Sequence, residues 1–401
     1  MIDVTILLGE GRGEIQALQG NSKLARYKVQ EPVSHLTFLY PRYIVAASCK
    51  KPLLYVWNLG QDSSVQKYVL PGLATALTAS PCGNYLAVGV DNSLRIWHLP
   101  SGQQIVCLSG HYQKISSLVW RGGFLISGAE DNTINVWQSA KVITNSNGTH
   151  SPLHTFTSHS MPVTDLFCGL GGPRCRLFSV SLDNTSQIWE LASGRHLLSL
   201  EFPAPLSKLL VDKMESVVLG VSLTTSVYKI SLTEDQTSGD IREELKPFIT
   251  VPSQIKSAAL TDSDQSLLLG LSSGELVKFS VTTGQALPMS YRSSSNSPVE
   301  ELLTVTVAQF PRNNKPEIFP FSHPLDRATC PGVREESEVI LSPAHTPLIC
   351  PGNTEFTALV RDAVEEGGNR LSAAEDKVKQ LSGLSEELIR FTTNHILSNG
   401  S

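Results

Sequence analysis

The sequence reads Leu-Tyr-Val-Trp at residues 54–57, and this pattern, an apolar run that ends in an aromatic residue, recurs along the chain of 401 residues. The further copies are Leu-Arg-Ile-Trp97, Ile-Asn-Val-Trp137 and Ser-Gln-Ile-Trp189, followed by the weaker Ser-Val-Tyr228 and Leu-Val-Lys-Phe279. The successive aromatic residues are 40, 40, 52, 39 and 51 positions apart. A repeat of about 40 residues is the length of one WD-repeat propeller blade. The two long intervals contain polar insertions at 139–151 and 233–243, which we interpret as surface loops.

Each period can be divided into four short strands separated by turn signals. The fourth unit is the clearest, with strands expected at 163–167, 177–181, 186–191 and 196–202. In three units the turn between the second and third strands is an Asp-Asn pair, at 91–92, 131–132 and 183–184. These residues favour turns because their side chains hydrogen-bond nearby amides and they tolerate left-handed backbone. Since almost no helical periodicity precedes residue 350, we predict an all-β fold.

The number of blades follows from the strands outside the six clear units, which run from about residue 33 to residue 291. One strand-like run follows them at 299–307, and three precede them at 4–8, 14–18 and 24–29. One strand from the end and three from the start complete a seventh blade, and this pairing covers edges that an open ring would expose. The prediction is a seven-bladed β-propeller closed by both ends of the chain.

Certain polar residues recur at matching places and are expected to hold the blades together. His111, Ser127, Asp131 and Trp137 in the third blade correspond to His159, Ser179, Asp183 and Trp189 in the fourth, and Asp91, Trp97 and Trp57 occupy related positions in the first two blades. A Ser, a His and an Asp could also form a nucleophilic triad, but that chemistry needs an exposed serine and an oxyanion site. Because the set occurs twice, we interpret it as a buried hydrogen-bond network. We expect no catalytic residues, no cofactor and no metal.

The chain changes character after the propeller, which we assign to residues 1–307. Residues 308–352 are irregular and proline-punctuated but contain Phe319 and Phe321, so we expect this segment to dock along a surface. Residues 353–398 form a helical tail in which apolar residues recur at steps of three and four. This stripe is a candidate interface, through pairing with another chain or through packing on the propeller; its members are Leu371, Val378, Leu381 and Leu388.

Composition limits the classes of function. Lys and Arg total 32 and Asp and Glu total 37, for a net charge of −5, whereas proteins that live on nucleic-acid backbone usually have a basic excess. Direct contact with RNA is therefore left open. Neither a membrane-spanning run nor a secretion signal is present, and the seven cysteines have no disulfide-framework spacing.

Several stretches resemble one known family, the WD-repeat subunit of the rixosome, called WD-repeat-containing protein 18 in animals. They are Ser-Pro-Cys-Gly-Asn-Tyr-Leu-Ala-Val-Gly at 80–89, Ser-Gly-His-Tyr-Gln at 109–113, Phe-Leu-Ile-Ser-Gly at 124–128 and Ser-His-Ser-Met-Pro-Val-Thr-Asp-Leu-Phe-Cys-Gly-Leu-Gly-Gly at 158–172. The resemblance extends over nearly the whole chain. It departs from strong WD repeats in blades five and six, where Tyr228 and Phe279 replace Trp and the Asp turn is lost.

The resemblance implies a non-catalytic scaffold for large ribosomal subunit maturation and removal of the internal transcribed spacer from pre-rRNA, in the nucleus (nucleolus and nucleoplasm). The implied partners are α-helical-repeat subunits of the rixosome, the pre-60S ribosomal particle and its remodelling ATPase. Self-association through the terminal helix is implied too. Two alternatives stay open: a substrate-recruiting adaptor of a ubiquitin ligase or chromatin complex, and a DNA replication licensing factor.

Overall fold

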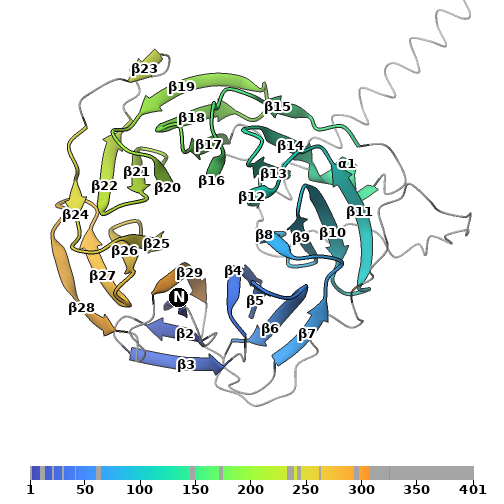
Figure 1. Ribbon diagram of the computed structural model, residues 1–401, viewed down its shortest axis with the longest axis horizontal. Helices are drawn as coiled ribbons and strands as arrows, with labels where there is room; N and C mark the ends of the chain where they lie inside the picture. Colours follow the sequence, from blue (N-terminus) through green and yellow to red (C-terminus); the bar gives the residue numbers. More distant parts are fainter. Residues whose placement is uncertain are drawn as a thin grey trace, which may run out of the picture. The chain divides into compact units, whose positions relative to one another are not determined.

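The computed structural model describes residues 2–9, 14–19, 22–28, 31–40, 42–59, 65–144, 150–170, 175–232, 239–241, 245–261, 263–292, 298–307 and 325. Contacts between Cα atoms divide the chain into two units, Met1–Arg334 and Glu335–Ser401, and every described residue lies in the first. The first unit is a ring of seven sheets arranged like blades around a central axis, as Figure 1 shows. The predicted all-β, seven-bladed propeller is therefore confirmed.

Each blade has four antiparallel strands, given in order from the inner to the outer strand. Blade 1 comprises β4 (Val33–Leu39), β5 (Tyr43–Ser48), β6 (Leu53–Asn58) and β7 (Val65–Val69), and blade 2 comprises β8 (Ala74–Ala79), β9 (Tyr85–Val90), β10 (Ser93–His98) and β11 (Gln103–Ser109). Blade 3 comprises β12 (Ile115–Arg121), β13 (Phe124–Ala129), β14 (Ile134–Gln138) and β15 (His154–Phe156), and blade 4 comprises β16 (Val163–Cys168), β17 (Arg176–Ser181), β18 (Thr185–Glu190) and β19 (Arg195–Glu201). Blade 5 comprises β20 (Leu206–Val211), β21 (Val217–Ser222), β22 (Ser226–Ser231) and β24 (Ile249–Thr250), and blade 6 comprises β25 (Ile255–Leu260), β26 (Ser266–Leu271), β27 (Glu275–Ser280) and β28 (Ala286–Arg292).

Blade 7 closes the ring in the way the sequence predicts. Its inner strand is β29 (Val299–Val307), and its other strands are β1 (Ile2–Gly9), β2 (Glu14–Gln19) and β3 (Ser22–Lys28). Strands β29 and β1 pair antiparallel from Ile2↔Val307 to Leu8↔Glu301, and Figure 1 marks the N-terminus beside β29. The two ends of the propeller thus share one sheet, so neither leaves an inner strand edge unpaired.

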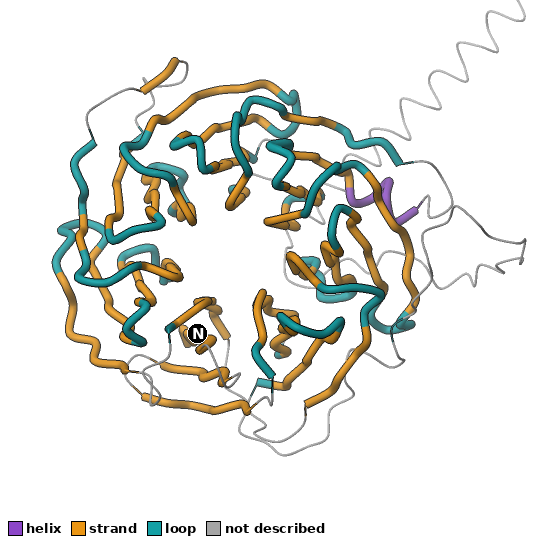
Figure 2. The backbone as a smooth tube through the Cα atoms, viewed as in Figure 1, coloured by secondary structure: helices purple, strands orange, loops and turns teal. Residues whose placement is uncertain are grey.

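The two insertions are not only surface loops, and here the sequence interpretation was wrong. A short helix, α1 (Ser139–Thr144), begins the first insertion; its Val142 is 3% exposed and belongs to the apolar cluster between blades 2 and 3. Strand β23 (Gly239–Ile241) of the second insertion pairs parallel with β19, as a fifth strand of blade 4. Figure 2 shows α1 in purple at the outside of the ring. Both elements cover surface that the outer strands would otherwise leave open: apolar side chains in one case and an unpaired backbone edge in the other.

The hydrophobic core consists of seven clusters, each lying between two neighbouring blades. Successive residues of a strand point to opposite faces of its sheet. In β13, Leu125 accordingly packs toward blade 2, and the next residue, Ile126, packs toward blade 4. Because both faces of a blade are buried, its strands read as near-continuous apolar runs, which is the pattern that revealed the repeat.

A glycine in β13 allows blades 3 and 4 to approach closely. A Cβ atom added at Gly128 would lie 2.8 Å from Cγ1 of Val163, the first residue of the next inner strand. Gly270 of blade 6 has the same relation to Val299 of blade 7, at 2.8 Å. Any side chain at these two positions would force the blades apart.

Two inner-strand carboxylates also join neighbouring blades. Asp165 Oδ2 of blade 4 accepts a hydrogen bond from the Leu209 amide of blade 5 at 3.1 Å, and Glu301 Oε2 of blade 7 accepts one from the Leu36 amide of blade 1 at 2.6 Å. Each amide follows a register shift in its own inner strand. A shift of this kind leaves a backbone group unpaired, and the carboxylate satisfies it.

Of the region predicted to dock after the propeller, the structure describes Leu325. This side chain is 5% exposed and packs into the apolar cluster of blades 1 and 2. The candidate interface residues lie outside the described residues; they are Phe319, Phe321, Leu371, Val378, Leu381 and Leu388.

Candidate functional site

The structure brings together the four polar residues singled out in blade 3. His111 precedes β12, and its Nε2 lies 2.8 Å from Ser127 Oγ in β13. Its Nδ1 lies 3.2 Å from Asp131 Oδ2 in the turn that follows β13. The indole Nε1 of Trp137 donates to Ser127 Oγ at 3.4 Å. These contacts form one chain, in which Trp137 donates to Ser127, Ser127 to His111 and His111 to Asp131.

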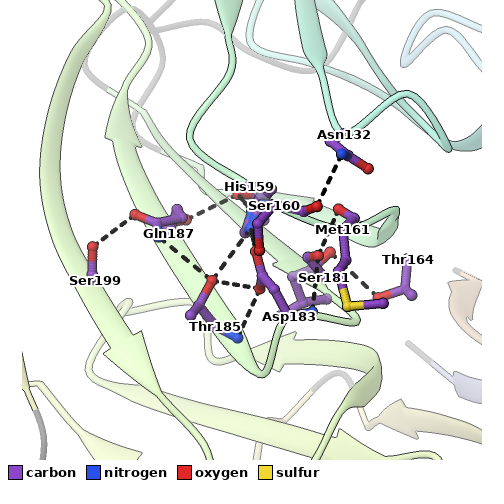
Figure 3. Close-up of polar contacts among 12 residues, drawn as sticks. Asn132, His159, Ser160, Met161, Thr164, Ser181, Asp183, Thr185, Gln187 and Ser199 are labelled. Carbon is purple, nitrogen blue, oxygen red and sulfur yellow. Dashed lines mark hydrogen bonds and ion pairs between the residues drawn. The ribbon is translucent and has the colours of Figure 1, made fainter.

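Blade 4 repeats this chain, as Figure 3 shows for its polar end. His159 Nε2 lies 2.9 Å from Ser179 Oγ, and Nδ1 lies 3.0 Å from Asp183 Oδ2. Trp189 Nε1 donates to Ser179 Oγ at 3.4 Å. Two blades therefore solve the same problem, the pairing of buried polar groups, with the same residue types at the same register.

The arrangement has the connectivity of a Ser-His-Asp triad but not its accessibility. Ser127 and Ser179 are both 0% exposed, and each accepts an indole N–H, so no substrate carbonyl can approach either hydroxyl. Burial lowers the pKa of His111 below its ordinary value despite the nearby Asp131 carboxylate. A neutral ring then donates from Nδ1 to the carboxylate and accepts the Ser127 hydroxyl proton at Nε2, so the contact is a hydrogen bond and not an ion pair.

Threonines, which the sequence reasoning missed, complete both networks. Thr133 Oγ1 donates to Asp131 Oδ1 at 2.6 Å, and Thr185 Oγ1 donates to Asp183 Oδ1 at 2.7 Å. The signal was present, because Asp-Asn-Thr occurs at 131–133 and again at 183–185. Burial raises the pKa of the Asp131 carboxyl, but hydrogen bonds from Thr133 and from the Tyr112 amide outweigh it and hold that pKa below its ordinary value.

The turn asparagines link one blade to the next. Asn92 Nδ2 of blade 2 donates to the carbonyl of His111 at 3.3 Å, and Asn132 Nδ2 of blade 3 donates to the carbonyl of Ser160 at 3.1 Å. Asn132 has φ of 65°, a left-handed conformation that asparagine tolerates. These bonds fasten the loops that enter β12 and β16.

The remaining predicted network residues lie elsewhere. Asp91 is exposed at its turn with φ of 51°, and Trp97 is fully buried in the cluster between blades 1 and 2. Trp57 is 1% exposed, and its indole Nε1 has no hydrogen-bond partner. The position of blade 1 that corresponds to Ser127 and Ser179 is Ala46, because Ile44↔Trp57 matches Leu125↔Trp137 in register.

The orphaned indole leads to a stability prediction. Ala46→Ser should place a hydroxyl where Ser127 stands in blade 3, and the new hydrogen bond to Trp57 should raise the free energy of unfolding by about 0.5–1.5 kcal/mol. The measurement is chemical denaturation of both proteins. Ala47→Ser is the matched control, because Ala47 is also fully buried but packs in the cluster on the opposite side of the blade, between blades 1 and 2. A hydroxyl there should destabilise. Equal effects of the two substitutions would contradict the assignment.

The buried histidine and carboxylates predict that acid destabilises the fold. The pKa of His111 is lower in the folded protein, so the unfolded chain binds more protons as pH falls below about 6.5, and stability is lost. The pKa values of Asp131 and Asp183 are also lowered, which adds a second loss below about pH 4. Urea denaturation between pH 7.5 and 5 isolates the histidine contribution, and His111→Gln should reduce the pH dependence in that range. An unchanged slope in this variant would contradict the account.

The loops held by these networks present exposed side chains. We define the rim as residues 110–114 and 157–162, which lead into β12 and β16. Tyr112 is 92% exposed while its amide is fixed by Asp131 Oδ2 at 2.8 Å, and Met161 is 45% exposed. Leu73, in the corresponding loop before β8, is 44% exposed. Aromatic and methionine side chains on a rigid backbone are typical of protein-binding surfaces.

No group of three or more His, Cys, Asp or Glu side chains suited to a metal ion lies within the part of the chain that the structure describes. No helix among those residues is both long and apolar enough to cross a membrane.

Comparison with known proteins agrees with the repeat. The family model of the WD domain, G-beta repeat, matches residues 66–98 and 102–138. WD repeat-containing protein 18 of Danio rerio is 33% identical over 209 residues, covering 51% of this chain and 48% of that protein, and the Homo sapiens protein is 35% identical over 201 residues, covering 49% and 46%. Pre-rRNA-processing protein IPI3 of Yarrowia lipolytica is 32% identical over 198 residues, covering 47% and 46%. The chain spans about half the length of the curated relatives it matches, which is less than the near-complete extent expected from the motifs.

Solved structures support the architecture alone. A chain of the mitotic checkpoint complex superposes with a TM-score of 0.55 at 17% identity, covering 67% of this chain and 79% of that one. The computationally designed Ika8 protein gives a TM-score of 0.54 at 20% identity, covering 73% and 85%.

Proposed function

Because this chain is a WD-repeat protein homologous over about half of its length to WD repeat-containing protein 18 and to pre-rRNA-processing protein IPI3, we propose that it acts in ribosome biogenesis. Its role is that of a non-catalytic scaffold for large-subunit maturation and spacer removal, in the nucleus. Its partners are the helical-repeat subunits of the rixosome and the pre-60S particle with its remodelling ATPase. The homology to proteins named for pre-rRNA processing carries this proposal.

The geometry supports a scaffold in two ways. The one arrangement that resembles catalytic machinery in the described part of the chain is buried and repeated, so it serves the fold. The rim, by contrast, holds Tyr112 and Met161 at the surface on a backbone that hydrogen bonds have already ordered. A pre-ordered surface loses little conformational entropy on binding, which favours its use as a protein contact.

Depletion of the protein tests the function. Precursor rRNA that still carries the internal transcribed spacer should accumulate, large subunits should become scarce, and re-expression of the full chain should reverse both. Rescue by a Tyr112→Ala, Met161→Ala double variant should be weaker although its melting temperature is unchanged. Normal precursor rRNA after depletion would contradict the proposal and favour a ubiquitin-ligase or chromatin adaptor, or a replication licensing factor.

We divide the chain into a propeller at 1–307, a docking segment at 308–352 and a helical tail at 353–398, and we propose that the tail pairs two copies. The support is the spacing of its apolar residues, since a single stripe on an isolated helix needs a partner surface. Replacing Val378 and Leu381 with Asp should reduce dimerisation in light scattering while the melting temperature of the propeller stays within about 1 °C, because exposed substitutions change stability little. Monomeric proteins in both cases, with a lower melting temperature for the variant, would mean that the tail packs on its own propeller.

A further inference from the structure

Two cysteines of blade 4 lie in direct contact. Cys168 ends the inner strand β16, Cys175 immediately precedes β17, and their sulfur atoms are 3.6 Å apart. Both side chains are buried, with exposures of 1% and 0%, in the cluster between blades 3 and 4. The structure describes three other cysteines, Cys49, Cys82 and Cys107, as free thiols with partial or full exposure.

The hairpin geometry places the two thiols on the same face of the blade. Cys168 stands opposite Leu177 in the β16–β17 register, and Cys175 precedes Leu177 by two residues, so its side chain points to the same side. The hydrogen bond from the Gly169 amide to the Arg176 carbonyl, at 3.0 Å, holds the strands together between them. Such diagonal neighbours across an antiparallel pair are close enough for their side chains to meet.

The chemistry of the pair is asymmetric. The Cys168 thiol donates its hydrogen toward the sulfur of Cys175, which favours the thiolate of Cys175 and lowers its pKa. The same hydrogen bond, together with burial, raises the pKa of Cys168. The thiolate is the nucleophile in disulfide exchange, so Cys175 is the residue expected to attack first.

The pair also lies close to the protein surface. Leu170, two residues after Cys168, is 56% exposed, and the pair sits at the end of the hairpin and not in its middle. Opening the last backbone pair of a hairpin requires less free energy than global unfolding. A small oxidant can therefore reach the sulfur atoms without disrupting the ring.

We propose that Cys168 and Cys175 form a dithiol site that a small-molecule disulfide of the oxidised-glutathione type converts into an intrachain disulfide across β16 and β17. The Cys175 thiolate attacks one sulfur of oxidised glutathione, forms a mixed disulfide and releases one glutathione thiolate. Cys168 then loses its proton, and its sulfur attacks that of Cys175 and expels the second glutathione. Two protein thiols are oxidised to one disulfide, and one glutathione disulfide is reduced to two thiols.

The test uses the full-length chain in buffers with graded ratios of reduced to oxidised glutathione. After free thiols are alkylated and the protein is digested, mass spectrometry should find a cross-linked peptide joining Cys168 to Cys175, two hydrogens lighter than the reduced pair and restored by dithiothreitol. Exposed Cys49 should form only a mixed adduct with glutathione. The melting temperature of the oxidised protein should not fall, because the strands already hold the sulfurs in contact.

The wild-type protein alone can overturn the proposal. Two alkylated thiols at 168 and 175, under conditions that modify Cys49, would show that the site does not react, and two separate glutathione adducts would show that it does not close. As variants, Cys107→Ser should leave the yield of the cross-link unchanged, and Cys168→Ser should abolish it and leave any adduct at Cys175 unresolved. This inference is independent of the proposed function, so failure of either leaves the other standing.

Discussion

Removing residues 1–20 is expected to unfold the whole ring and not only to fray one end. The deletion takes away β1 and β2, and with them the partner of the inner strand β29. Buried apolar side chains are lost as well; the large ones are Val4, Ile6, Leu7, Leu8, Ile15 and Leu18. At roughly 1.5–3 kcal/mol for each, their burial is comparable to the ~5–15 kcal/mol net stability of a typical domain. Thermal denaturation followed by circular dichroism should give no cooperative transition.

The control for this deletion is removal of residues 353–401, which belong to the second unit of the chain. That protein should melt at the wild-type temperature, within about 1 °C. If the protein without residues 1–20 also melted at the wild-type temperature, blade 7 would not need its N-terminal strands, and closure of the ring by both ends of the chain would be wrong.

Replacing Asp183 with Ala should destabilise the fold more than any other single substitution proposed for this protein. The carboxylate accepts hydrogen bonds from the ring of His159, from the Ser160 amide, and from both the amide and the hydroxyl of Thr185, at 2.7–3.0 Å. His159 is 5% exposed, so its N–H would be left buried without a partner. Each orphaned buried donor costs about 1–3 kcal/mol, and we expect a loss of roughly 3–4 kcal/mol in urea denaturation.

Two variants calibrate that result. Asp183→Asn keeps one side-chain oxygen as an acceptor and should lose less than half as much stability. Glu130→Ala removes an exposed carboxylate from the corresponding turn of blade 3 and should change stability by less than about 0.5 kcal/mol. A loss for Asp183→Ala no greater than that for Glu130→Ala would contradict the buried network.

Local sequence patterns were enough to predict the architecture. The alternation along each strand and the aromatic at a fixed place are properties of one blade, and a repeated blade can form a ring in few ways. Blade 7 could be predicted because a lone strand at 299–307 and three strands before residue 30 leave no other pairing that protects the edges. The His, Ser and Asp of blades 3 and 4 could be identified because the same spacing occurs twice.

Contacts between different blades could not be predicted, because they depend on register in three dimensions. Asn132 reaches the Ser160 carbonyl across a blade boundary, and Glu301 reaches the amide of Leu36, which is 265 residues away in the sequence. The contact of Cys168 with Cys175 also needs the β16–β17 register, since the two residues flank a glycine-rich turn. The helix α1 escaped prediction because six residues are too few to establish a helical period.

The most direct test of the proposed role is sedimentation of nuclear extract from cells that express the tagged full-length chain. We expect part of the protein to co-sediment with large-subunit precursor particles, and the RNA recovered with it to be precursor rRNA that contains the internal transcribed spacer. The result that would contradict the account is a protein found entirely in light fractions, without precursor rRNA, in a gradient where the precursor particles themselves sediment normally.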